Sequence, residues 1–493
     1  MMKRLSYLLL LPLLLLTGCA WDDLGDENSG YPAEIGEILI HRCATSGCHT
    51  STSAEAAAGL NLETWQSLYH GSNGGSAVIP YSPDQSYLLF ATNTDSSNGD
   101  PVLKPTMPIG GLQLSTDEYA RLRNWILEGG SNAKGEERFP PVSSRRKWYV
   151  INQGCDVVAV MDAESRQIMK YVRVGQSTAN ESPHYIRVSK DGLHWYVVFL
   201  RINPYIEIYS TLTDEKVGQI QIGNGSWNTM NFSADGKFAV AVSYVLPDSS
   251  GTSQMVLVNL QTEAVTPVNF GPKVHGSAAH PMMRRFYITE QEGDGLWYLD
   301  YDSTGAIQGY DHIDLVRGVP PHNGAARLGP HEVYFIPDGS KYFVTCQYAN
   351  EVRIYRTSDD QLLSVINVGN QPVEFGIAPS KHLIFVTVME DQTTFGADRR
   401  KVGSVAIIDY NTNTLVKSLY TGYQPHGIVV DEQSNMAIVA HRNISTDGPA
   451  PHHSSNCGGR NGYLRGIDLN TLELVPDFKT EMVTDPYSIA VKH

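Results

Sequence analysis

Positive charge is scarce in this chain of 493 residues, which carries 37 Lys and Arg against 52 Asp and Glu and a formal net charge of −15. The sequence has no cluster of Lys and Arg, and this argues against nucleic acid and anionic lipid as partners. It also has no Ser/His/Asp order, phosphate-binding glycine loop or carboxylate pair above background, so nothing predicts a hydrolase. After the N-terminal leucine-rich run, no apolar stretch is long enough to span a bilayer.

The N-terminal residues have the pattern of a bacterial export signal. Lys3 and Arg4 precede a leucine-rich run, and the tetrapeptide Leu-Thr-Gly-Cys that ends at Cys19 resembles the lipobox of lipoproteins. We predict that residues 1–18 are a signal peptide, that Cys19 is lipidated, and that residues 19–30 are an acidic tether. Because alanine rather than aspartate follows Cys19, we expect an outer-membrane lipoprotein, periplasmic or surface-facing, whose lipid is its only membrane contact.

Residues 43–49 read Cys-Ala-Thr-Ser-Gly-Cys-His. Two thiols that each add to a haem vinyl group, followed by an imidazole for the iron, are what covalent attachment of haem requires. Cys43, Cys48 and His49 therefore predict one covalent haem c. Two other interpretations stay open, namely a local disulfide in an exported domain and a zinc site in which His49 joins the two thiolates.

The residues around this heptad have the pattern of a small helical domain. Met107 lies between two prolines that stiffen its backbone, and a capping box at Ser115 predicts a helix that ends at a Gly-Gly pair. On these features residues 31–131 resemble class I c-type cytochrome modules, including those with a longer spacer between the cysteines. The resemblance implies an all-α domain whose haem iron is held by His49 and Met107, and His70 is the rival for the second position.

The remainder of the chain is built from repeats of about 40–55 residues. Each unit reads as an apolar strand, an Asp-Gly turn, an alternating strand, a Val/Ile strand that ends in Asp, and a last strand that ends in Gly. This pattern predicts the four-stranded blades of an all-β propeller over residues 145–493, joined to the first domain by a linker at 132–144.

Seven blades follow from the count of units. Residues 145–175 supply three outer strands of one blade, and residues 485–493 supply its inner strand, so pairing of the two ends closes the ring. The units resemble the YVTN family of bacterial propellers, most closely at residues 149–152 and 157–162.

Four histidines stand at the entrances of inner strands of the predicted blades, and we expect them to surround the mouth of the central channel: His184, His275, His331 and His426. At the same position the other units carry Asn228, Val373 and Tyr487. Imidazoles that converge on a channel predict a site for copper, iron or a second haem. The alternative is that a histidine at this place is only a common feature of such repeats.

Three cysteines lie in the repeat region. Cys155 falls in a loop of the first blade and Cys457 in a loop of the last, and these blades are neighbours in a closed ring. We therefore expect a Cys155–Cys457 disulfide in an oxidising compartment. Cys346 is expected to be a buried free thiol.

Three functions remain open at this point. The first is an extracytoplasmic, lipid-anchored c-type cytochrome that carries electrons through one haem, with the propeller as a docking platform for a basic redox partner protein. The second is a haem-dependent oxidoreductase with a metal or second haem at the channel mouth. The third is a non-catalytic surface binding protein with a redox-sensing haem module.

Overall fold

The computed structural model describes residues 26–98, 102–201, 203–246, 251–271, 273–390, 402–442, 457 and 459–493. Cys19, the signal peptide and the first part of the predicted tether lie outside these residues. Within them, no helix combines the length and the apolar character that a membrane span requires.

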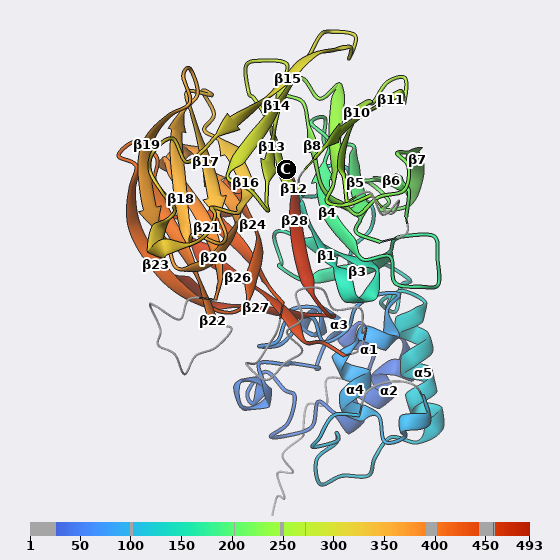
Figure 1. Cartoon of the computed structure of the whole chain (residues 1–493). Coiled ribbons are helices and arrows are strands. Elements are labelled where there is room, and N and C mark those ends of the chain that lie inside the picture. Colours follow the sequence, from blue (N-terminus) through green and yellow to red (C-terminus); the bar gives the residue numbers. More distant parts are fainter. Residues whose placement is uncertain are drawn as a thin grey trace, which may run out of the picture.

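Seven four-stranded antiparallel sheets surround a central axis, so the predicted seven-bladed β-propeller is confirmed (Figure 1). From the inner to the outer strand, the first blade comprises β28 (Pro486–Lys492), β1 (Lys147–Asn152), β2 (Val157–Asp162) and β3 (Ile168–Arg173). The second comprises β4 (Pro183–Val188), β5 (His194–Phe199), β6 (Tyr205–Ser210) and β7 (Lys216–Gln221). The third comprises β8 (Trp227–Phe232), β9 (Phe238–Ser243), β10 (Ser253–Asn259) and β11 (Val265–Phe270).

The remaining blades follow the chain in order. The fourth comprises β12 (Val274–Ala279), β13 (Arg285–Glu290), β14 (Gly295–Tyr301) and β15 (Ile307–Asp314). The fifth comprises β16 (Pro330–Phe335), β17 (Lys341–Cys346), β18 (Glu351–Arg356) and β19 (Gln361–Asn367). The sixth comprises β20 (Asn370–Ala378), β21 (Leu383–Glu390), β22 (Val402–Asp409) and β23 (Thr414–Tyr423). The seventh comprises β24 (Pro425–Asp431), β25 (Met436–His441), β26 (Gly462–Asp468) and β27 (Leu474–Met482).

The blades form because Val, Ile and aromatic side chains pack between neighbouring sheets. Tyr149 of the first blade lies 5.5 Å from Trp195 of the second, which stacks on Tyr209 at 3.9 Å between ring centroids. The Asp-Gly turns end the inner strands as predicted, and Gly192 there has a φ of +73°, which favours glycine.

The helices gather in residues 26–131, which we call the helical segment. They are α1 (Asp26–Ser29), α2 (Ala33–Arg42), α3 (Trp65–Leu68), α4 (Tyr87–Thr92) and α5 (Thr116–Leu127). The predicted capping box is present, since Ser115 and Glu118 bond to each other's backbone N–H, and α5 is followed by Gly129 and Gly130 with positive φ.

The expected all-α cytochrome c-like domain over residues 31–131 is wrong. Among the described helices of this stretch, only α2 and α5 exceed six residues, and much of the remainder is irregular or forms short 3-10 turns. The physical reason is visible between residues 69 and 86, where three glycines and two prolines interrupt any helix. The resemblance to class I cytochromes therefore does not extend to the fold.

Arg460 ties the helical segment to the propeller. The residue is 5% exposed, and its guanidinium donates hydrogen bonds to the carbonyls of Ser76 at 2.9 Å and Gln85 at 3.0 Å and lies 4.0 Å from the ring centroid of Tyr87. The Tyr87 hydroxyl in turn donates to the Glu481 carboxylate of β27. In Figure 1 the helices accordingly lie beside the blades that contain β1, β3 and β27.

The first and last blades meet at a seam that is closed in two ways. The inner strand β28 pairs with β1, in a register that places Lys147 opposite Lys492 and Val150 opposite Ile489. Across the seam, Cys155 forms a disulfide with Cys457, 302 residues away in the sequence. The strand pairing had been expected because the first unit lacks its inner strand, and the disulfide because its two cysteines lie in loops of blades that are neighbours in a closed ring.

We predict that replacing Cys155 and Cys457 by serine lowers the free energy of unfolding by about 2–5 kcal/mol, because the disulfide restricts the unfolded chain over a long loop. Urea unfolding of the double variant and of wild type should show this difference, and dithiothreitol should lower the wild-type midpoint to that of the variant. Equal midpoints for wild type with and without reductant would show that the disulfide contributes nothing.

Candidate functional site

Five aromatic side chains close into a ring inside the propeller channel. The ring centroids of successive members lie 6.2, 3.9, 6.1, 3.8 and 4.4 Å apart, in the order His184, His275, His331, His426, Tyr487 and back to His184. All five side chains are buried. The structure therefore brings together the four histidines that the sequence placed at strand entrances, with Tyr487 of β28 as the fifth member.

A shared backbone irregularity accompanies this ring. Each ring residue is the second residue of its inner strand, and at that point the register between the inner strand and its neighbour shifts. Such bulges redirect a side chain away from the regular alternation of a strand. The strands that carry Asn228 and Val373 have the same shift. We infer that the repeated bulge turns seven side chains toward the axis.

Threonines of the blades hold the ring backbone in place. The hydroxyl of Thr289 donates to the carbonyl of His331 at 2.9 Å, and the hydroxyl of Thr387 donates to that of His426 at 2.6 Å. In both pairs the threonine belongs to the preceding blade, so each bond also links two blades. The ring is thus part of a cooperative network of buried polar groups.

Two of the imidazoles have a defined orientation. Nδ1 of His184 lies 2.7 Å from the carbonyl oxygen of Asn228, and Nδ1 of His275 lies 3.2 Å from that of His331. Because a carbonyl only accepts, Nδ1 carries the proton in both rings and Nε2 retains its lone pair. Burial lowers the pKa of His275 to about 4, so this imidazole is neutral at pH 7.

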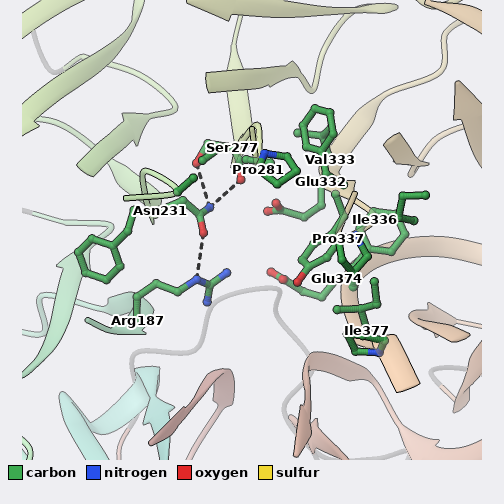
Figure 2. A pocket seen from close by; sticks show the side chains of 18 of the residues that line it. Arg187, Asn231, Ser277, Pro281, Glu332, Val333, Ile336, Pro337, Glu374 and Ile377 are labelled. Atoms are coloured by element: carbon green, nitrogen blue, oxygen red, sulfur yellow. Dashed lines mark hydrogen bonds between the residues drawn. The ribbon is translucent and has the colours of Figure 1, made fainter. Parts of the chain in front are cut away.

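A layer of ionisable and polar side chains lies next to the ring and lines a cavity of about 460 Å³ (Figure 2). Arg187 approaches this cavity from one side, where its Nε donates to Asn231 at 3.0 Å, and the carboxylates of Glu332 and Glu374 face it from the other. The Asn231 amide donates in turn to the carbonyl of Ser277 at 2.6 Å. Sequence reasoning had not identified any of these residues.

The two carboxyl groups are neutral or nearly so at pH 7. Burial raises the pKa of Glu332 to about 8, and burial together with the neighbouring Glu332 raises that of Glu374 to about 8. Arg187 lowers both pKa values but does not offset the burial. A sequence signal was available, because Glu332 and Glu374 directly follow the ring positions His331 and Val373.

One part of this region has the geometry of a cation site. His275, His331 and Glu332 are all buried, and each offers a ligand atom within 4.8 Å of the others. His184 and His426 belong to the ring but not to this group of three. Of the four predicted histidines, the structure thus places two in this cluster, together with the carboxyl group of Glu332.

The heptad forms a second candidate site, in the helical segment. Cys43 directly follows α2 and is buried, Cys48 is exposed, and both are free thiols. The backbone N–H of His49 donates to the carbonyl of Cys43 at 3.2 Å, which closes the loop. The His49 imidazole places Nδ1 3.1 Å from the carbonyl of Leu60. The local disulfide that the sequence left open is thus not formed.

The predicted second ligand lies in another loop. Met107 follows α4, is half-buried, and its backbone N–H donates to the carbonyl of Ala91 at 2.7 Å. The rival His70 is exposed, and its carbonyl accepts a hydrogen bond from Gln167 of the propeller. His452 and His453 of the long insertion lie outside the described residues.

Comparison with known proteins identifies the propeller and nothing more specific. No family model and no curated protein sequence matches the chain. A functionally unknown protein from Desulfotomaculum acetoxidans superposes with a TM-score of 0.52 at 15% identity, over 70% of this chain and 99% of that one. A putative 6-phosphogluconolactonase from Bacteroides uniformis superposes with a TM-score of 0.51 at 14% identity, over 71% and 100%.

At these identities the similarity establishes the fold alone. No match supports a cytochrome fusion or membership of the YVTN family, so both resemblances drawn from the sequence are set aside.

The raised pKa of Glu374 predicts a pH dependence of stability. The folded state retains a proton up to about pH 8 that the unfolded state releases near its ordinary pKa of 4.5. The free energy of unfolding should therefore fall as the pH rises between these values, by a few kcal/mol at most. In Glu374→Gln the fall should be smaller.

Urea unfolding midpoints at pH 5, 6, 7 and 8 in a chelating buffer test this, with Glu55→Gln as the control at an exposed carboxylate. The Glu55→Gln profile should overlay that of wild type. If Glu374→Gln overlays it as well, the Glu374 carboxyl is ionised in the fold and the assignment is wrong.

Proposed function

We propose that the protein is an electron carrier with one covalently bound haem c, attached through Cys43 and Cys48 and ligated by His49, and that the propeller is the platform on which a redox partner docks. A haem supplies a reversible one-electron couple at its iron. Because the helical segment lacks a cytochrome fold, haem attachment would depend on the local chemistry of the heptad.

The orientation of His49 is the observation that carries the proposal. A metal-binding histidine usually donates one ring N–H to a backbone carbonyl, which fixes the tautomer and presents the other nitrogen as a ligand. His49 is arranged in this way, because Nδ1 is engaged by Leu60 and, among the residues that the structure describes, no hydrogen bond involves Nε2. The two thiols needed for attachment lie in the same closed loop and are unpaired.

The loop of the proposed second ligand supports an apolar contact. Leu103, Ile109 and Leu112 flank Met107 and are 40%, 64% and 85% exposed, respectively. Apolar side chains so exposed and so close in sequence are expected where a cofactor or a partner protein covers them. Prolines on both sides of Met107 restrict the backbone that would hold its sulfur at the iron.

Two further observations support the location and the partner. The Cys155–Cys457 disulfide favours an oxidising compartment, as does attachment of haem outside the cytoplasm. The net charge of −15 favours a basic partner, which long-range attraction would steer to the surface. The lipid anchor at Cys19 belongs to this proposal and lies outside the described residues.

We predict that the protein carries one covalent haem when it is produced in cells with haem-attachment machinery, and that Cys43→Ser/Cys48→Ser carries none. Denaturing gels stained for haem and intact mass spectra measure this. Cys346→Ala is the matched control, since it removes a buried thiol of β17 and should leave attachment unchanged. A wild-type protein without covalent haem would leave the surface binding protein as the function.

The second ligand is tested separately. Met107→Ala should retain the covalent haem and lower its reduction potential by ~100 mV, a fraction of the ~0.8 V range that axial ligands span. His70→Ala should leave the potential unchanged. Spectroelectrochemistry of wild type and the two variants measures the reduction potential. A shift of the potential in His70→Ala but not in Met107→Ala would identify His70 as the second ligand.

A further inference from the structure

We propose that the propeller channel binds one divalent transition-metal ion through His275, His331 and Glu332, independently of the haem. Their ligand atoms lie within 4.8 Å of one another. Zinc-type sites place nitrogen and oxygen ligands at ~2.0–2.2 Å from the ion. Three ligand atoms within 4.8 Å of one another would reach this distance from a central ion if they moved together by about 1 Å.

The state of Glu332 provides the second, independent argument. Its side chain is buried, with a relative exposure of 4%, and among the described residues Oε1 has no hydrogen-bond partner. A buried carboxyl oxygen without a partner is costly, so native structures rarely retain one without a compensating group. A cation bound beside the two imidazoles supplies that compensation.

The surroundings give the ion a route of entry and an open coordination position. Glu332 lines the cavity of about 460 Å³, which also exposes the Glu374 carboxyl and the Arg187 guanidinium. An ion held by Glu332 at the edge of this cavity has room for water or a small anion as a fourth ligand, as in catalytic zinc sites. Arg187 on the opposite side would favour an anionic ligand.

The donor set selects the class of metal. Two imidazoles and one carboxylate suit Zn²⁺, Co²⁺ or Fe²⁺, whereas Ca²⁺ and Mg²⁺ prefer six or more oxygen ligands. Zn²⁺ is therefore the probe, since it has no redox chemistry that would disturb a haem.

The experiment uses the full-length protein with the substitutions Cys43→Ser and Cys48→Ser, so that neither haem nor zinc at the heptad contributes to binding. The protein is treated with a chelator, dialysed and titrated with Zn²⁺ in a calorimeter, and bound metal is counted by mass spectrometry. We expect one equivalent of Zn²⁺ to bind. Binding should also raise the urea unfolding midpoint, and this measurement reports binding even if the conformation of the channel stays the same.

Substitutions in the ring then identify the ligands. Glu332→Gln and His275→Gln should weaken Zn²⁺ binding at least ~100-fold, more than the ~10–100-fold typical of outer-shell changes. His184→Gln is the matched control, because it lies in the same ring, is equally buried and is outside the cluster. Circular dichroism and urea midpoints verify that each variant is folded.

Two results would overturn the proposal. One is the absence of saturable Zn²⁺ binding by the parent protein. The other is a weakening of binding by His184→Gln equal to that by His275→Gln and Glu332→Gln. The haem proposal is unaffected by either result, because covalent attachment is measured on protein with both heptad cysteines intact.

Discussion

The pairing of β28 with β1 is the interaction on which the rest of the structure depends. It makes the end of the chain the inner strand of the first blade and so removes two free sheet edges at once. It also places Tyr487 between His426 and His184, at centroid distances of 3.8 and 4.4 Å, and completes the aromatic ring. Lys492 reinforces the closure, because its ammonium donates to the backbone carbonyl of Arg145 at 2.8 Å just before β1. The same strand pairing therefore closes the propeller and completes the aromatic ring in the channel.

Polar side chains gather in the channel of the propeller, and the bulges of the inner strands explain how they come together. In a regular strand His331 and Glu332 would point to opposite faces, because successive side chains alternate. The register shift between Pro330 and Val333 breaks this alternation and allows both residues to contribute to one cluster. Burying a carboxyl group there opposes folding, and the interblade hydrogen bonds of Thr289 and Thr387 help to hold the strands together against that cost.

This geometry also shows which features the sequence could predict. The seven blades were predictable, because Asp-Gly turns and terminal glycines recur and an incomplete first unit implies closure by the last strand. The ring histidines and the Cys155–Cys457 pair followed from the same repeat, since equivalent positions in neighbouring units must meet. The sequence did not reveal Glu332 and Glu374, because side chains alternate along a regular strand. The residue after a ring position would then point toward the interface between blades and not toward the channel. The prediction of a cytochrome-like domain was wrong because a capped helix downstream of the heptad does not make the intervening Gly- and Pro-rich chain helical.

The seam between the seventh and first blades also positions the helical segment. Arg460, three residues after Cys457, reaches the carbonyls of Ser76 and Gln85, so the disulfide and the docking contact belong to the same loop. Ile79 of the segment packs in one hydrophobic cluster with Trp148 of β1 and Phe478 of β27, which makes the seam part of a shared core. The segment that carries the heptad is thus held against the two blades whose pairing completes the channel ring.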